Sequence, residues 1–188
     1  MSAQDRARWD AFYSERATEP LPDPDPLVLA YTPPLLPGDT QRALDAAGGT
    51  GQNALWLAEQ GYHVDLMDIS RPALLRAQEE MRQRNLRNIN CFQVDFDTAE
   101  LQPETYALIV IMRFLSQPLM TQLRAATRPG GRILFETFHQ GYLRLKPNFN
   151  PAYLLQRGEA LSFFSDWLIL HHAELSTVSQ VVAIKPES

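Results

Sequence analysis

The sequence has little cysteine, no long hydrophobic run and fewer basic than acidic residues. Its 188 residues include a single cysteine, Cys91, so it can form no intrachain disulfide and lacks the thiolate pairs of a structural zinc site. No run approaches the about eighteen apolar residues of a membrane span, and the polar first ten residues contain no signal core. We therefore expect a cytoplasmic protein with no membrane association and no metal site.

The charge balance narrows the class of partner. The chain has 17 Lys and Arg against 22 Asp and Glu, a net charge of -5 at pH 7. A general nucleic-acid binder needs a basic surface field, so this balance favours a small-molecule substrate and no nucleic acid. With 45% hydrophobic residues, a chain of this length forms one ordinary core. We expect one domain over 1–188, as a monomer or homodimer.

Proline marks a boundary near the N-terminus. Seven of the 14 prolines fall between Pro20 and Pro37, where fixed φ angles and missing amide donors exclude a continuous helix or central strand. Before them, Trp9, Phe12 and Tyr13 follow the i, i+3, i+4 spacing of one helix face. The prediction is a lead helix within 1–19, a connector at 20–37 and a sheet-and-helix core at 38–188.

Within the core, apolar strand-length runs alternate with helix-period runs from residue 42 to residue 138. This alternation predicts an α/β fold, a mostly parallel sheet with helices on both faces. RPGG at 128–131 indicates a turn before a strand at 132–138, and 158–167 indicates a short helix. Two adjacent strand-like runs at 165–175 and 176–186 predict an antiparallel hairpin at the end of the sheet.

A glycine-rich turn follows the first predicted strand, which ends at Asp45. Gly48, Gly49 and Gly51 allow a tight strand-to-helix turn in which a ligand approaches bare backbone. The second predicted strand closes at Asp68, the position from which a carboxylate accepts both hydroxyls of an adenosine ribose. This spacing predicts a nucleoside-containing ligand at the carboxyl ends of the strands.

Two cofactors are compatible with this turn, and charge separates them. Residues 49–54 satisfy the GxGxx(G/A) form of a dinucleotide site, but Asp45 would repel the pyrophosphate at the helix N-terminus. S-adenosylmethionine has an ammonium and a sulfonium and no phosphate. Asp45 would then attract the ligand, Asp68 would hold its ribose, and Asp95, closing the third strand, would accept from the adenine amine. We favour S-adenosylmethionine, with a nicotinamide dinucleotide as the alternative.

Four segments together resemble a known family: LDAAGGTG (44–51), ALWLAEQGYHVDLMDIS (54–70), VDFD (94–97) and RPGGRILFETF (128–138). They resemble the class I S-adenosylmethionine-dependent methyltransferases. Through WDAFY (9–13), SRPALLRAQ (70–78) and the tail at 149–174, the chain is most similar to the small bacterial group related to tellurite-resistance methyltransferases. The resemblance implies a Rossmann-like seven-stranded sheet of order 3-2-1-4-5-7-6, with the last strand antiparallel.

The resemblance also implies a set of cofactor-binding residues. Ala47 stands where the family motif usually has its first glycine, and alanine cannot adopt glycine-only dihedral angles. In relatives the lead helix covers the cofactor crevice, which assigns Tyr13 to the site. The residues expected to contact the cofactor are Tyr13, Asp45, Ala47, Gly48, Gly49, Gly51, Asp68, Ile69, Asp95 and Phe96.

Candidate catalytic residues lie just past the fourth and fifth predicted strands. Arg113 has the donor geometry to hold an anionic substrate, or is a surface or helix-capping arginine. His139 has the ordinary pKa of a general base, or is a plain loop histidine. Glu136 lies within an apolar strand, so it needs a partner or faces the crevice.

These observations predict methyl transfer from S-adenosylmethionine to a small-molecule acceptor. Tellurite, selenite, thiols and other small metabolites are all compatible with the resemblance. Two alternatives stay open: a nicotinamide-dependent oxidoreductase, and a non-catalytic S-adenosylmethionine-binding regulatory subunit.

Overall fold

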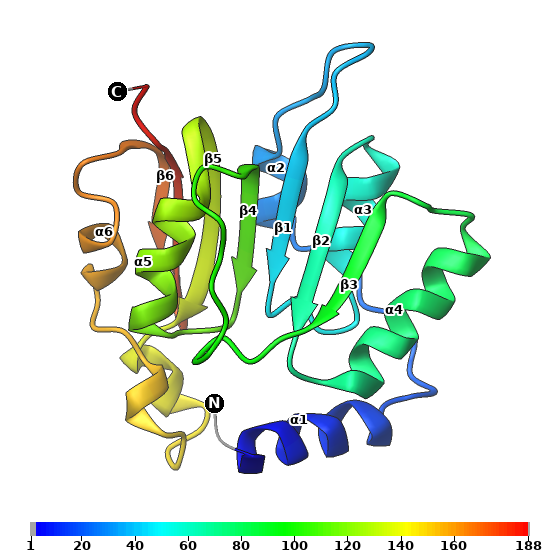
Figure 1. Cartoon of the computed structure of the whole chain (residues 1–188). Helices are drawn as coiled ribbons and strands as arrows, with labels where there is room; N and C mark the ends of the chain where they lie inside the picture. Colours follow the sequence, from blue (N-terminus) through cyan, green and yellow to red (C-terminus); the bar gives the residue numbers. More distant parts are fainter. Residues whose placement is uncertain (1–2, 188) are drawn as a thin grey trace. The chain divides into compact units, whose positions relative to one another are not determined.

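The structure is a computed structural model that describes residues 3–187 (Figure 1). Seven strands form a sheet of order β3-β2-β1-β4-β5-β7-β6. The β1–β2, β2–β3 and β4–β5 pairs are parallel, whereas β5–β7 and β6–β7 are antiparallel. The predicted α/β class and strand order are therefore confirmed. The strands are β1 Arg42–Ala46, β2 His63–Asp68, β3 Ile89–Gln93, β4 Tyr106–Met112, β5 Thr127–Phe138, β6 Leu168–Glu174 and β7 Val178–Ile184.

Helices occupy the predicted segments, and one more lies within the proline-rich connector. There, Pro26 takes the first helical position, where its missing N–H is not needed, and the Asp25 carboxylate accepts from the Leu27 amide at 3.0 Å. No helix within residues 3–187 has the length and apolarity of a membrane span. The helices are α1 Ala3–Glu15, α2 Pro26–Tyr31, α3 Gln52–Glu59, α4 Arg71–Gln83, α5 Gln117–Ala126 and α6 Glu159–Ser162, with 3-10 helices η1 Gln140–Arg144 and η2 Pro151–Tyr153.

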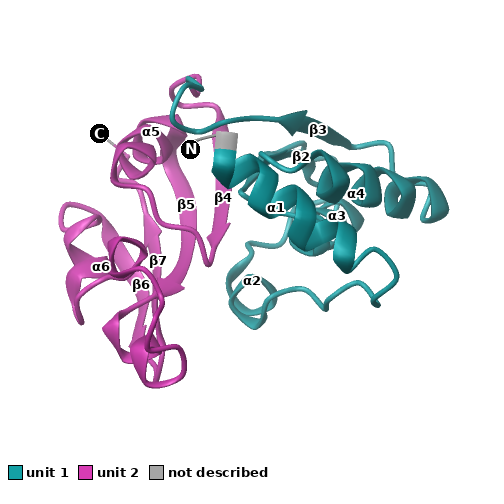
Figure 2. Ribbon diagram, turned by 90° about the horizontal axis from the view of Figure 1, so that it is seen from below, with its two compact units in different colours: residues 1–100 teal, residues 101–188 magenta. Residues whose placement is uncertain are grey.

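The chain divides into two compact units, residues 1–100 and residues 101–188 (Figure 2). Their charges have opposite signs. Unit 1 has nine basic and sixteen acidic residues, a net charge of -7, whereas unit 2 has eight basic and six acidic residues, a net charge of +2. The acidic excess of the protein therefore belongs to unit 1 alone. The expectation of a single domain stays a prediction.

Helix α1 lies at the edge of unit 1 where β1, β2 and β3 have their carboxyl ends (Figures 1 and 2). Two contacts with α4 hold it there. The Asp10 carboxylate accepts from the Arg71 amide at 3.2 Å, and the Arg76 guanidinium donates to the carbonyls of Arg16, at 3.0 Å, and Glu19. These contacts hold α1 and the residues that follow it against α4. The aromatic residues of α1 therefore stay beside the carboxyl ends of β1, β2 and β3.

Two details of the strands differ from the sequence predictions. β3 ends at Gln93, so Asp95 belongs to the following loop and does not close the strand. RPGG at 128–131 is part of the long strand β5 and does not form a separate turn. Gly130 has a φ of 71°, and the register between β4 and β5 shifts between Tyr106 and Leu108. The glycines therefore allow the backbone irregularity in β5 where its pairing with β4 shifts register.

Candidate functional site

The turn after β1 is tight because three of its residues have a left-handed backbone. Ala47, Gly49 and Gly51 have φ angles of 53°, 57° and 77°, and Gly51 is the N-cap of α3. A Cβ atom added at Gly48 would lie 2.6 Å from a carboxylate oxygen of Asp45. The loop therefore brings bare backbone against an acidic side chain, in the strand-to-helix turn that the sequence predicts.

Asp45 is 1% exposed, on the penultimate position of β1. Its Oδ2 accepts from the Ala54 amide at 3.0 Å, in the first turn of α3. Its Oδ1 has no hydrogen-bond partner within residues 3–187. Burial, reinforced by the charge of Asp68, raises the pKa of Asp45 to about 7 against the lowering effect of the Ala54 amide. A buried oxygen without a donor is rare in proteins, and here it marks a position for a donor that the chain does not supply.

Asp68 links the end of β2 to the glycine turn. Its Oδ2 accepts from the Gly49 amide and its Oδ1 from the Ser70 amide, both at 2.8 Å. Burial raises the pKa of Asp68, and the charge of Asp10 raises it further, although its backbone hydrogen bonds oppose the change. Asp45 and Asp68, two carboxyl groups whose burial disfavours the ionised form, thus lie at the same turn.

Tyr13 brings α1 to the same turn. Its hydroxyl lies against Gly49, so close that a Cβ atom added at Gly49 would collide with the Tyr13 oxygen. Burial, together with the charges of Asp68 and Asp45, raises the pKa of Tyr13, so the hydroxyl keeps its proton and can donate. The ring also packs against Phe12 and Trp9, with centroids 5.1 and 6.1 Å away. Of this predicted aromatic face, Tyr13 is the member in contact with the glycine turn.

The side chains of the other predicted cofactor residues, Ile69, Asp95 and Phe96, are buried or half-buried. The side chains of Ile69 and Phe96 are buried in the core. Asp95 is half-buried, and its Oδ1 accepts from the Asp97 amide at 3.0 Å, which shapes the loop after β3. Contacts from these three residues to an adenine ring stay predictions.

The residues at the turn fit a cationic nucleoside. An ammonium would supply a donor for Oδ1 of Asp45 and a countercharge for both carboxylates. A pyrophosphate would instead add negative charge beside two buried acids. The orphan oxygen of Asp45 therefore favours S-adenosylmethionine over a dinucleotide. Within residues 3–187, no group of three or more His, Cys, Asp or Glu side chains is placed to hold a metal ion.

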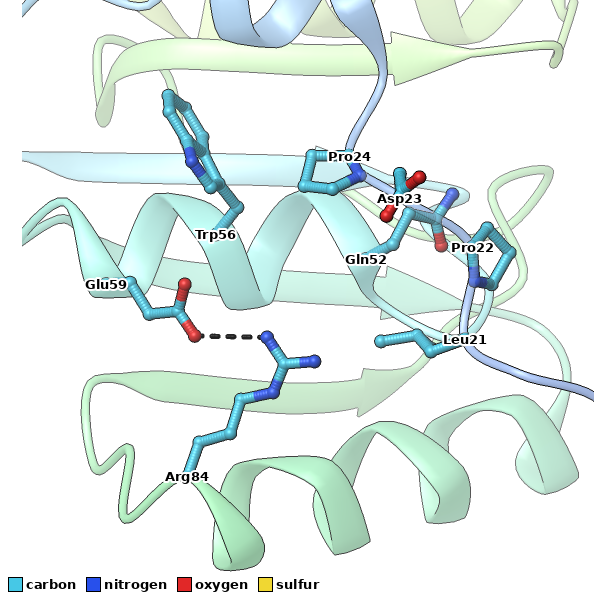
Figure 3. Close-up of a pocket in the computed structure, with 8 residues that line it drawn as sticks. All are labelled: Leu21, Pro22, Asp23, Pro24, Gln52, Trp56, Glu59 and Arg84. Atoms are coloured by element: carbon cyan, nitrogen blue, oxygen red, sulfur yellow. Dashed lines mark hydrogen bonds and ion pairs between the residues drawn. The ribbon is translucent and has the colours of Figure 1, made fainter.

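A separate pocket of about 220 Å³ lies in unit 1, lined by residues of α3, the connector and the end of α4 (Figure 3). Trp56 and Glu59 of α3 line it, and Glu59 pairs with Arg84 at 3.0 Å. The other lining residues are Leu21, Pro22, Asp23, Pro24 and Gln52. None of the predicted cofactor residues lines this pocket. At the glycine turn itself, the Tyr13 side chain occupies the space above the backbone.

In unit 2, the structure joins two of the predicted catalytic candidates. Glu136, on β5, is 5% exposed, and its Oε1 lies 3.4 Å from Nε of Arg113. Its Oε2 accepts from Nε2 of Gln180 at 2.7 Å. Glu136 thus has the partner that an acid in an apolar strand requires. Sequence reasoning missed Gln180, which is a half-buried polar residue within the mostly apolar strand β7.

His139 does not fit the role of a general base. The ring is fully buried, its Nδ1 accepts from the Gly141 amide at 2.8 Å, and its Nε2 lies 2.9 Å from the Leu175 carbonyl. These contacts assign a neutral imidazole that carries its proton on Nε2 and has both nitrogens engaged. His139 therefore connects η1 to the β6–β7 turn, and the general-base interpretation is not supported.

The left-handed backbone of Ala47 leads to a stability prediction. Ala47→Gly is expected to raise the free energy of unfolding by about 0.5 to 1 kcal/mol, because this conformation costs an L-residue about 1 to 2 kcal/mol and the freedom of unfolded glycine offsets part of the gain. Urea unfolding measures the change. Ala46→Gly, one residue earlier in a buried strand, is the matched control and should destabilise the protein. A destabilised Ala47→Gly protein would refute this account of the turn.

Comparisons with known proteins agree with this geometry. Residues 43–131 match the family model described as a methyltransferase domain. A tRNA 5-carboxymethoxyuridine methyltransferase from Escherichia coli is 31% identical over 97 residues, which cover 48% of this chain and 37% of that protein. The match thus spans well under half of this relative's length.

Two solved structures show the same fold. TehB from Haemophilus influenzae has a TM-score of 0.72 at 18% identity, covering 94% of this chain and 67% of its own. A SAM-dependent methyltransferase from Methanosarcina mazei has a TM-score of 0.69 at 16% identity, covering 89% of this chain and all of its own. Residues 43–131 are therefore similar to a methyltransferase domain, and the seven-stranded sheet has the fold of these two proteins.

Proposed function

We propose that this protein transfers a methyl group from S-adenosylmethionine to a small-molecule acceptor. The observation that carries the proposal is the buried acid pair at the glycine turn, where Oδ1 of Asp45 has no donor within the described residues. A ligand with an ammonium and a ribose supplies the charge and the donors that this turn needs. When bound, the cofactor provides an electrophilic methyl group on a sulfonium.

The residues of unit 1 hold and orient the ligand in this proposal. Asp45 accepts from the amine, Asp68 accepts from the ribose hydroxyls, and the turn backbone allows close approach. Tyr13 lies over Gly49, so its side chain must move before a ligand reaches the turn. Its return would place an aromatic ring beside the bound cation and exclude water, an attraction of about 0.5 to 2 kcal/mol.

An RNA acceptor is the second candidate, favoured by the name of the Escherichia coli relative. RNA binding relies on a basic surface, and the net charge of unit 2 is only +2, while that of unit 1 is -7. The charge distribution therefore favours a small acceptor.

A transfer assay with two acceptor pools tests this function. The protein is incubated with S-adenosylmethionine carrying a tritiated methyl group, together with either the small-molecule fraction or the RNA fraction of a bacterial extract. We expect enzyme-dependent label in the small-molecule fraction. Label in the RNA fraction alone would show that the acceptor is RNA and not a small molecule. Label in neither fraction would favour a non-catalytic S-adenosylmethionine-binding subunit.

A further inference from the structure

The pocket of unit 1 has one wall made by the connector, and this wall is held at both ends (Figure 3). Before it, the Arg76 guanidinium of α4 donates to the Glu19 carbonyl. After it, the Asp25 amide donates to Oδ1 of Asn53 on α3 at 2.8 Å. Between these anchors, residues 20–24 have proline at every second position, which restricts the backbone. The wall is therefore preformed, so a ligand orders little of the chain when it binds.

Trp56 lines the opposite side of the pocket from α3. It shares one helix face with Gln52 and Glu59, which precede and follow it by one turn and also line the pocket. The side chain is half-buried, and within residues 3–187 its ring has no ring–ring or cation–π contact and its indole N–H has no hydrogen-bond partner. Tryptophan is the aromatic residue that attracts a cation most strongly through its face. Trp56 thus offers this pocket an unused surface for a ligand.

The charges that line the pocket favour a cation. Glu59 pairs with Arg84 at 3.0 Å, and Arg84 also lies 3.3 Å from Glu80, so the guanidinium charge is already compensated. Asp23 is exposed, and its carboxylate has no hydrogen bond or ion pair in the part of the chain that the structure describes. The net charge of -7 on unit 1 adds to the attraction for a positive ligand. An anion would instead meet Asp23 with no guanidinium free to receive it.

We propose that this pocket binds an organic ammonium with an apolar stem or ring, for which Trp56 supplies the aromatic surface and Asp23 the countercharge. The inference goes beyond the proposed methyl transfer and does not depend on it, because none of the predicted cofactor residues lines the pocket. The volume of about 220 Å³ is smaller than the roughly 300 to 1,000 Å³ of drug-sized sites, so the occupant is small or only partly enclosed. A free amine and a lysine side chain of another protein share this chemistry.

Titration with a pair of matched probes tests the site. 2-Phenylethylammonium has a ring and a positive charge, and 2-phenylethanol has the same ring without the charge. The protein has three tryptophans, and Trp56→Phe identifies the indole N–H signal of Trp56 in a nitrogen-15 NMR spectrum. We expect this signal to shift and saturate with the ammonium, and to require about 3- to 30-fold more of the alcohol. Equal affinity for the two probes would overturn the preference for a cation, and an unmoved Trp56 signal would overturn the site.

Two aspartate variants separate the pocket from the general field of unit 1. Asp23→Asn should remove most of the preference for the ammonium over the alcohol and leave the affinity for the alcohol unchanged. Asp39→Asn is the matched control, because Asp39 is an exposed aspartate of the same unit that does not line the pocket. Both side chains are exposed, so both variants should fold. An equal loss of preference in the two variants would assign it to net charge and overturn the role of Asp23.

The backbone amide signals locate the probe within unit 1. The pocket predicts shifts at Gln52 and at residues 21 and 23 of the connector, which line it. Shifts confined to residues 47–51 would place the ammonium at the glycine turn, where Oδ1 of Asp45 has no donor within residues 3–187, and would overturn the pocket as its site.

A third probe distinguishes the two sources of the ammonium. Nα-acetyl-lysine methylamide presents a lysine side chain as it occurs in a protein. Tighter binding of this probe than of 2-phenylethylammonium would support the pocket as a site for a basic side chain of a partner, and the reverse order would support a free amine. Because none of these titrations involves methyl transfer, failure of this inference and failure of the proposed function give separate results.

Discussion

Replacement of Asp68 by alanine is expected to weaken the binding of S-adenosylhomocysteine by about 1.5 to 3 kcal/mol, or roughly 10- to 150-fold. Two effects add. The variant loses the carboxylate that we assign to the ribose hydroxyls, and it releases the Gly49 amide, which Asp68 holds at 2.8 Å. Calorimetric titration of wild type and variant measures the difference.

Asp65 provides a matched control on the same strand. It is a buried carboxylate that pairs with Arg42 of β1 at 2.6 Å and accepts from Asn90 of β3 at 2.9 Å. Asp65→Ala is expected to lower stability and to leave the affinity of the folded protein unchanged. Equal affinity in wild type and Asp68→Ala would remove Asp68 from the site.

The raised pKa of Asp45 predicts that the ligand-free protein loses stability as the pH rises. The unfolded chain has the ordinary value of 3.8, and the folded protein has a value of about 7, so the folded state holds this proton more tightly. The free energy of unfolding should therefore fall between about pH 4 and pH 7, by on the order of 4 kcal/mol, and level off above.

Urea unfolding at pH 5 and pH 8 measures this slope. Asp45→Asn keeps an acceptor for the Ala54 amide and removes one titrating group, so its slope should be smaller, and the raised pKa of Asp68 should account for the slope that remains. The affinity of wild type for S-adenosylhomocysteine should rise with pH up to about 7, because the ammonium binds the ionised form. A variant with the wild-type slope would show that another group carries the pH dependence.

Local patterns were sufficient for the architecture. Alternating apolar runs predict the parallel strands, and the two adjacent runs near the C-terminus predict the antiparallel pair β6–β7. The RPGG segment misled the prediction because glycine and proline also occur in irregular strands, where pairing with β4 and β7 decides the structure.

The glycine turn, too, could be predicted only in part, because some of its features depend on local sequence and others on tertiary packing. Its position and its acidic neighbours follow from the sequence, but the left-handed backbone of Ala47 depends on the tight turn around it. Likewise, no local pattern shows that the Tyr13 hydroxyl contacts Gly49, since this depends on how α1 docks against α4.

The contacts among Arg113, Glu136, Gln180 and His171 in unit 2 could not be predicted from the sequence, for a related reason. Arg113, Glu136, Gln180 and His171 come from four strands or strand ends separated by up to 67 positions in the numbering. Only the order β4-β5-β7-β6 makes them neighbours. The sequence identified Arg113 and Glu136 through strand ends and burial, whereas Gln180 becomes visible only through its pairing with Glu136 on β5.

A crystal structure with S-adenosylhomocysteine bound would show whether the glycine turn is the cofactor site. We expect the amine of the ligand within hydrogen-bond distance of Oδ1 of Asp45, the ribose hydroxyls on Asp68, and the Tyr13 hydroxyl displaced from Gly49. A ligand bound elsewhere, with Oδ1 of Asp45 still without a donor and Tyr13 still against Gly49, would contradict it.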